Sequence, residues 1–139
     1  MNTRDLFYNN IISDYYFIKS LIFAEITLPE DEFALYKKLF YIIHQKLPQP
    51  DLLIYLYSDL ERLQKNISKR GRDYERQITD EYLTKIHKGY FNFLSQQNTF
   101  PTIILNITNI DFVDQKEDFM KILVSLDKTY EKGIHRINF

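Results

Sequence analysis

Basic side chains gather in one short stretch of this 139-residue chain. Residues 65–76 hold five Lys and Arg residues against two acidic ones, a net charge of +3, although the whole chain has a formal charge of −1. Arg70 and Arg72 flank Gly71 there, and guanidinium forks match phosphate oxygens well. A cationic island on an acidic chain indicates an anionic ligand. The alternative is a solvated helix end with basic residues near its C-terminus, where the helix dipole favours them.

Three apolar runs indicate how such a cluster is positioned. They cover residues 11–14, 52–57 and 103–107. Runs that are continuous, and not alternating with polar residues, are typical of strands buried on both faces of a parallel sheet. Helical segments lie between the runs, with apolar residues spaced by three and four. We therefore expect an α/β fold, a parallel sheet covered by helices, built from right-handed crossovers.

The helix boundaries follow from residues that cap or break helices. A helix over about 33–47 stops before Pro48, which cannot continue it. Ser58 with Glu61 forms a capping-box pattern for the next helix, and Gly71 is its expected stop. Two further amphipathic helices cover about 82–94 and 119–126, the second with Asp114 and Glu117 as its expected cap.

Several ordered motifs resemble the bacterial deoxynucleoside kinase family, which includes deoxyadenosine and deoxyguanosine kinases. The resemblance covers essentially the whole chain, in matching order and spacing. It implies a P-loop-kinase-like parallel sheet and a single partial kinase domain over 1–139, with a lid region at about 65–78. The segments that carry it are 12–17, Lys19, 22–24, 50–56, 69–75, 81–83 and 109–113.

The family resemblance implies ATP-dependent, Mg-assisted phosphorylation of a deoxynucleoside 5′-hydroxyl, in nucleotide salvage. Arg70 and Arg72 match lid arginines that act in catalysis and bind the ATP phosphates, which fits the need of phosphoryl transfer for cations. Glu75 matches the lid carboxylate that binds the sugar 3′-hydroxyl. Asp111 and Phe112 match the loop that contacts the adenine of ATP. Simpler roles are a surface ion pair for Glu75 and a core position for Phe112.

The acceptor side of the expected site rests on Asp14, which ends the first apolar run. Family members have a general base there, within a Glu-Arg-Ser or Asp-Arg-Ser pattern. This chain has Ser13-Asp14-Tyr15 instead, so the arginine is missing, but Asp14 stays the expected catalytic base. Lys19 is assigned to substrate binding, with an ion pair to Asp14 as its alternative. Asn66 also departs from the family, which often has arginine there.

The phosphate loop of the family, Gly-x-x-x-x-Gly-Lys-Ser/Thr, is not found in these 139 residues, whose glycines are Gly71, Gly89 and Gly133. Such a loop cradles phosphates with backbone N–H groups. The family places this loop after its first strand, which lies between the strands that correspond to 11–14 and 52–57. Residues 4–7 resemble the tail of the helix that leads into the next strand. We therefore expect this chain, taken alone, to be inactive.

Other functions stay open at this stage. A non-catalytic binding or dimerisation module and a relative of the nucleoside monophosphate kinases are the alternatives. The resemblance also implies a homodimer through helices near 15–28 and 79–95. The charge argues against a nucleic-acid polymer as partner, no apolar run is long enough for a membrane span, and no cysteine or histidine pattern suggests a metal site. We expect a cytoplasmic protein.

Overall fold

A computed structural model describes residues 11–139 of the chain. The chain divides into two compact units, Met1–Lys46 and Leu47–Phe139, and each is described by itself. The helix tail expected at residues 4–7 lies outside the described part. Within 11–139, every helix is too short or too polar to cross a bilayer.

Two helices make up the described part of the first unit. Helix α1 covers Ile18–Thr27 and helix α2 covers Glu30–His44. The apolar spacing predicted α2 at about 33–47, and the family resemblance implied a helix near 15–28. Aromatic rings join them, because Phe17 stacks on Phe40 with ring centroids 4.8 Å apart. The Phe40 ring is buried, so this stack is the centre of the helix pair.

The prediction of a strand at residues 11–14 is wrong. The segment is irregular in the structure, and Ile11 and Ile12 are 73% and 98% exposed. A strand needs a neighbour to pair its backbone N–H and C=O groups, and no strand of the described chain pairs with this one. The apolar run marked a segment that could be a strand, but it could not supply the partner.

The second unit is built on a parallel sheet, as predicted. Its strands are β1 (Leu53–Tyr57), β2 (Pro101–Asn106) and β3 (Gly133–Asn138), in the order β1-β2-β3, with both pairs parallel. The first two match expected apolar runs. The third was missed by the sequence reasoning, because its residues mix polar and apolar types.

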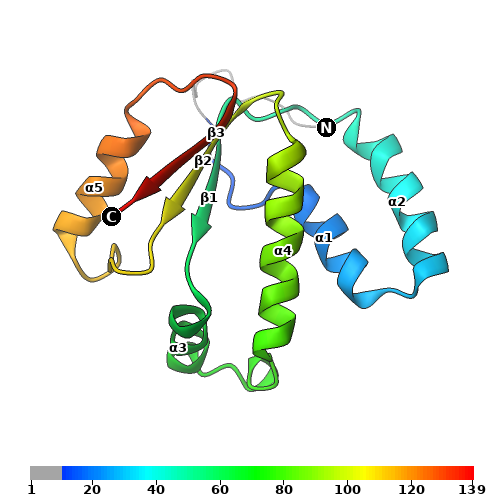
Figure 1. Cartoon of the computed structure of the whole chain (residues 1–139), viewed down its shortest axis with the longest axis horizontal. Helices are drawn as coiled ribbons and strands as arrows, with labels where there is room; N and C mark the ends of the chain where they lie inside the picture. Colours follow the sequence, from blue (N-terminus) through cyan, green and yellow to red (C-terminus); the bar gives the residue numbers. More distant parts are fainter. Residues whose placement is uncertain (1–10) are drawn as a thin grey trace. The chain divides into compact units, whose positions relative to one another are not determined.

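Helices lie on both sides of this sheet, with α5 (Lys116–Leu126) and α4 (Asp80–Gln96) flanking the strands in Figure 1. Ile103 and Leu105 of β2 are fully buried in a core with Ile122 of α5. The alternate residues of the strands face α4, where the Tyr55 ring lies 5.0 Å from that of Tyr90. Two covered faces explain why β2 is apolar along its whole length.

Helix α3 (Leu60–Arg70) begins at a different cap from the expected one. Asp59 accepts a hydrogen bond from the backbone N–H of Arg62 at 2.8 Å, whereas the Ser58 hydroxyl is buried and makes no hydrogen bond within the described chain. The helix ends at Gly71 with φ of 67°, as predicted, because glycine adopts this left-handed conformation without steric cost.

The cap expected for α5 is also wrong. The residue before the helix is Gln115, which gives no side-chain cap, and the Asp114 carboxylate instead lies 3.6 Å from the Lys69 ammonium group.

The correction at α3 gives a matched pair of variants. Asp59→Ala should lower the free energy of unfolding by about 0.5–2 kcal/mol, since it removes the cap. Ser58→Ala should change it by less than about 0.5 kcal/mol or stabilise the protein, because a buried hydroxyl without a partner carries a desolvation cost. Urea unfolding of both variants measures this, and a larger loss for Ser58→Ala would reverse the assignment.

Candidate functional site

A cleft of about 430 Å³ opens between α3 and the loop that follows β2. The loop covers residues 107–114. One wall is cationic and polar, and the other is mainly apolar, so the cleft can receive a ligand with an anionic part and a flat or apolar part. Its α3 wall is formed by Arg62, Asn66, Lys69 and Arg70, and its loop wall by Ile107 and 110–114.

Hydrogen bonds between the ends of β1 and β2 hold these two walls together. The Ile107 N–H donates to the Tyr57 carbonyl at 2.8 Å, which continues the strand pairing by one residue. The Asp59 N–H donates to the Thr108 hydroxyl at 3.1 Å. Arg62 then reaches across from α3 and donates to the Ile110 carbonyl at 3.2 Å. The cleft is therefore part of the sheet edge, and its width is fixed by the pairing.

The loop wall is shaped by two aspartates. Asp111 accepts hydrogen bonds from the N–H groups of Val113 and Asp114 through one carboxylate oxygen, so its side chain fixes the turn. Asp118 accepts from the Asp111 N–H at 2.9 Å. Hydrogen bonding from the Lys121 ammonium group, and then from that N–H, holds the pKa of Asp118 below its usual range. Because these bonds stabilise the ionised form, they are present at neutral pH and are lost as the pH falls through the lowered pKa.

The lid region starts where α3 ends. Arg70 and Arg72 both donate to the same oxygen, Oε1 of Glu75, at 3.1 and 3.4 Å. Gly71 between them has the positive φ that turns the chain back on itself, and a short 3₁₀ turn over Asp73–Glu75 returns the carboxylate toward both guanidinium groups. The turn brings two cations and one anion together within six residues.

Glu75 is the buried member of this cluster. It is 8% exposed, whereas the side chains of the two arginines are about half exposed. Its second oxygen, Oε2, is buried and has no hydrogen-bond partner within the described chain. A buried acceptor that is left unpaired is costly, so this oxygen can gain from a donor on a ligand. The alternative of an ion pair for Glu75 is present as its contact with Arg72, but the carboxylate is buried and does not lie on the surface.

The structure brings together three of the residues that the sequence assigned to ATP. Arg70, Asp111 and Phe112 all line the cleft. The Phe112 ring also packs against the core around Ile103, as its simpler role predicted, and its contact with adenine stays a prediction. Arg72 belongs to the Glu75 cluster next to the cleft and is not in its lining.

The acceptor residues Asp14 and Lys19 lie in the first unit. Asp14 sits in the irregular segment before α1 and is exposed. The Lys19 ammonium group lies over the Phe23 ring, 5.7 Å from its centroid. Such a cation on an aromatic face is a stable arrangement. The ion pair between Asp14 and Lys19 that was considered from the sequence is not among the ion pairs of the described chain.

Sequence reasoning missed Arg62 and did not use Asn66 and Lys69 as cleft residues. The signal for them was present. Positions 62, 66 and 70 are spaced by four, so they share one face of a helix, and Lys69 lies on the adjoining row. The sequence shows that this side of the helix is polar, but it does not show what the helix packs against. The partner is the loop after β2, which lies about 45 residues further along the chain.

Metal binding is not supported by carboxylate or histidine clusters in this part of the chain. No three such side chains within residues 11–139 lie close enough to share an ion. The magnesium that the resemblance implied is therefore not assigned a cluster of protein ligands among the described residues.

A parallel α/β sheet with a cleft at the carboxyl ends of its strands is the arrangement typical of the class of nucleotide-binding α/β folds. Comparison with protein families narrows this class. The family model for deoxynucleoside kinases matches residues 3–131. The chain belongs to the deoxynucleoside kinase family, and its fold is that of the P-loop-kinase-like proteins.

Curated relatives agree with this assignment. A deoxyguanosine kinase of Bacillus subtilis is 35% identical over 116 residues, which are 81% of this chain and 56% of the relative. A deoxyadenosine kinase of Lactobacillus acidophilus is 30% identical over 128 residues, 86% of this chain and 59% of the relative. A deoxyadenosine/deoxycytidine kinase of Bacillus subtilis is 31% identical over 99 residues, 70% and 46% of the two chains. The chain spans about half the length of these relatives.

Proposed function

We propose that this chain provides the lid, the acceptor residues and the donor-base cleft of a deoxynucleoside kinase that transfers a phosphoryl group from ATP to a deoxynucleoside 5′-hydroxyl. The observation that carries this is the cleft, which joins Arg70 to the Asp111–Phe112 loop. The reaction serves nucleotide salvage in the cytoplasm. Family membership supports the class of reaction, and the cleft supports the division of labour among the residues.

The donor nucleotide is held by chain segments with different chemistry. The apolar loop wall at Phe112 receives the adenine. Arg70 and Arg72 are directed to the phosphates, where guanidinium groups neutralise the charge that builds up on the oxygens during transfer. Glu75 holds both arginines in the structure described here, so the phosphates compete with it for their N–H groups. Magnesium, when bound with ATP, supplies further charge neutralisation at the phosphates.

Two carboxylates, one from each unit, are proposed to contact the acceptor nucleoside, and each is argued by itself. Oε2 of Glu75, buried and unpaired, accepts a hydrogen bond from the 3′-hydroxyl. Asp14 accepts the proton of the 5′-hydroxyl as its oxygen bonds to the γ-phosphorus, and the bond from that phosphorus to the bridging oxygen breaks, which gives a deoxynucleoside monophosphate and ADP. Lys19 binds the nucleobase side of the acceptor.

The first test compares two lengths of chain. Residues 1–139 should not phosphorylate any deoxynucleoside, because they contain no phosphate loop to cradle the triphosphate. The same residues joined to a family N-terminal segment that carries this loop should be active.

In that longer chain, Arg70→Ala and Arg72→Ala should each lower kcat by roughly 10²–10³, the usual cost of one transition-state donor.

The matched control is Arg76→Ala. Arg76 is an exposed lid residue that pairs with exposed Asp73, so its loss should leave turnover nearly unchanged. Each of the other two variants keeps one arginine on Glu75, and their melting temperatures should stay close to that of the parent. Full turnover in both Arg70→Ala and Arg72→Ala would show that neither arginine acts in the transfer. A longer chain that binds ATP but never turns over would favour the non-catalytic binding module.

Glu75 gives a prediction about the sugar. The longer chain should prefer a 2′-deoxynucleoside over its 2′,3′-dideoxy analogue by about 10- to 100-fold in kcat/KM, the value of a hydrogen bond to a charged group. Glu75→Ala should reduce this ratio severalfold, whereas Asp73→Asn, which alters an exposed carboxylate two residues away, should not. A ratio that is the same in Glu75→Ala and the parent would assign the 3′-hydroxyl to another residue.

We also propose a homodimer, to which α1 and α4 each contribute. Part of their aromatic surface is already used within the chain, since Tyr90 packs on Tyr55, but Tyr15 before α1 is 52% exposed. Sedimentation at micromolar concentration should show a dimer, and a monomer throughout that range would rule the interface out. The aromatic residues that suggested this interface are Tyr15, Tyr16, Tyr82, Tyr90 and Phe93.

A further inference from the structure

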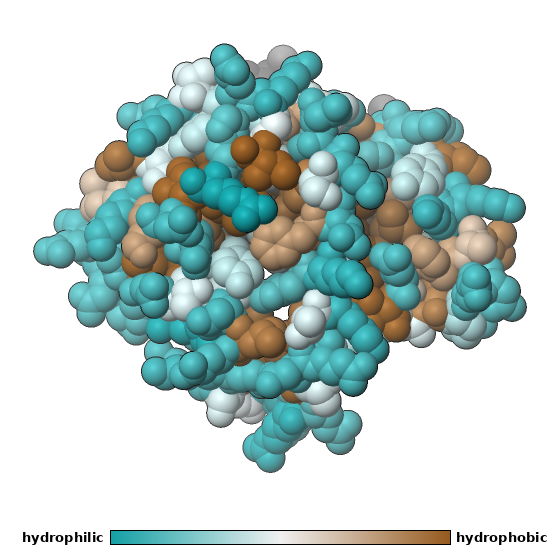
Figure 2. Space-filling model, in the orientation of Figure 1, coloured by the Kyte–Doolittle hydropathy of each residue, from teal (hydrophilic) through white to brown (hydrophobic). Residues whose placement is uncertain are grey.

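A second, smaller pocket lies on the other face of the sheet, beside α4. Its volume is about 220 Å³. The face of the molecule that carries α4 is hollowed beside that helix in Figure 2, with polar side chains around an apolar floor. The residues that line the pocket are Tyr57, Phe91, Ile104, Asn106, Arg136 and Asn138.

Strand register explains why these residues meet. Tyr57, Asn106 and Asn138 are the last residues of the three strands, and they are direct partners in the parallel pairing. Ile104 and Arg136 are also partners, one step back on the same face. Neighbouring side chains on one face of a sheet lie about 5 Å apart. The pocket is therefore assembled by the pairing of the whole sheet and does not depend on the position of one loop.

The two asparagines are ordered by each other. The Asn106 amide donates to the Asn138 side-chain carbonyl at 3.3 Å, and its own carbonyl accepts from the Thr108 N–H at 3.2 Å. Both ends of the Asn106 side chain are thus occupied. Asn138 uses its carbonyl in this contact, and no hydrogen bond within the described chain uses its amide N–H groups, so they serve as donors at the mouth of the pocket.

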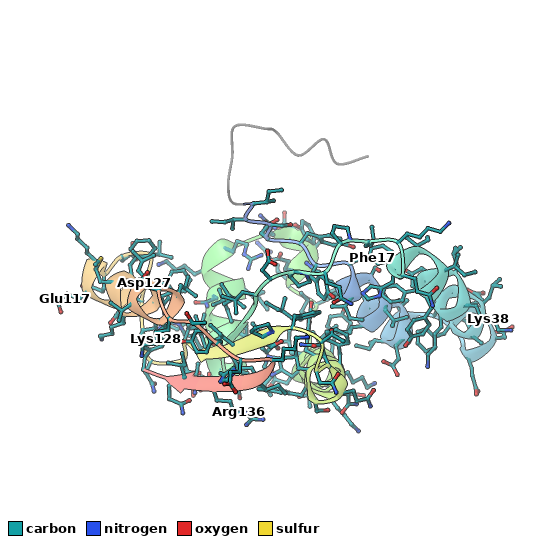
Figure 3. All side chains as sticks on the ribbon, turned by 90° about the horizontal axis from the view of Figure 1, so that it is seen from above. Phe17, Lys38, Glu117, Asp127, Lys128 and Arg136 are labelled. Atoms are coloured by element: carbon teal, nitrogen blue, oxygen red, sulfur yellow. The ribbon has the colours of Figure 1, made fainter. Side chains whose placement is uncertain are left out.

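Arg136 supplies the charge. It extends from β3 (Figure 3), and its guanidinium carbon lies 5.9 Å from the centre of the Phe91 ring, within cation–π range. It takes part in none of the ion pairs of residues 11–139, and no carboxylate lines the pocket. The Arg136 side chain is exposed, and a guanidinium fork is suited to a two-oxygen anion.

The aromatic walls limit the kind of ligand. The Tyr57 and Phe91 ring centroids are 5.6 Å apart, and the rings are inclined by 58°. They contact each other at this distance and leave no parallel slot for a nucleobase to stack between them. The space that remains is bounded by the Arg136 fork, the Asn138 amide and the Ile104 side chain, which suits a compact oxyanion next to an apolar group.

We infer that this pocket is a second anion-binding site, which takes a phosphate or carboxylate group through Arg136 and Asn138. It is separate from the cleft, because it lies on the opposite face of the sheet. It also lies partly outside the family match, which ends at residue 131, before β3 begins at Gly133. The site therefore does not depend on the kinase proposal.

The test is an NMR titration of residues 1–139 with inorganic phosphate and, separately, with acetate, each at an ionic strength held constant with sodium chloride. We expect saturating shifts of the Asn106 and Asn138 side-chain amide signals and of the Arg136 Nε–H signal. Whichever anion saturates at the lower concentration identifies the group that the site prefers. Arg70 and Arg72 signals, recorded in the same spectra, separate this binding from any binding at the lid.

Two variants complete the test. Arg136→Gln should weaken the anion at least about tenfold, because it removes the charge-assisted fork. Lys132→Gln is the matched control, since it removes one positive charge just before β3, at the opposite end of the strand from Asn138, and should leave the affinity unchanged. Shifts that rise linearly without saturation, or equal affinities for Arg136→Gln and the parent, would overturn the inference.

Discussion

Parallel pairing of the three strands is the constraint on which the rest of the second unit depends. It brings Tyr57, Asn106 and Asn138 to one edge, so every loop and helix that follows a strand starts from the same side. Helix α3 and the loop after β2 then face each other, and their polar contacts fix the cleft. The core beneath them is dry, with Ile103 and Leu105 fully buried. A site at this edge therefore inherits its geometry from the most buried part of the molecule.

Electrostatics at the lid depend on one carboxylate. Glu75 is buried, and two half-exposed arginines share one of its oxygens. Buried charges are stable only when paired, so the arginines compensate Glu75 while their outer N–H groups remain in contact with solvent. When an anion draws one guanidinium away, the other can still hold the carboxylate. The turn over 70–75 is thereby held by two ion pairs whose guanidinium groups are about half exposed.

The sequence predicted the elements that depend on local pattern and missed those that depend on distant partners. Continuous apolar runs located β1 and β2, and Gly71 marked the end of α3, because burial and left-handed backbone leave a direct trace in residue type. The run at 11–14 was also read as a strand, but it has no paired neighbour among the described strands. The choice of Asp59 over Ser58 as the cap accompanies the contact of its N–H with Thr108, which lies 49 residues away. In the same way, residue types pointed to Arg70, Arg72 and Glu75, but the sharing of one Glu75 oxygen is a property of the folded turn.

The cleft and the second pocket lie on opposite faces of the sheet, yet one chain of hydrogen bonds positions both. Asn138 contacts Asn106, Asn106 accepts from the Thr108 N–H, the Thr108 hydroxyl accepts from the Asp59 N–H, and Asp59 caps the helix that carries Arg62. Spatial continuity of this kind is not in itself energetic coupling, which needs an element with two discrete arrangements. Each link here starts from the last residue of a strand or the first turn of a helix, positions that the sheet already holds. The chain of contacts is therefore a common frame to which both sites are attached, and not evidence of communication between them.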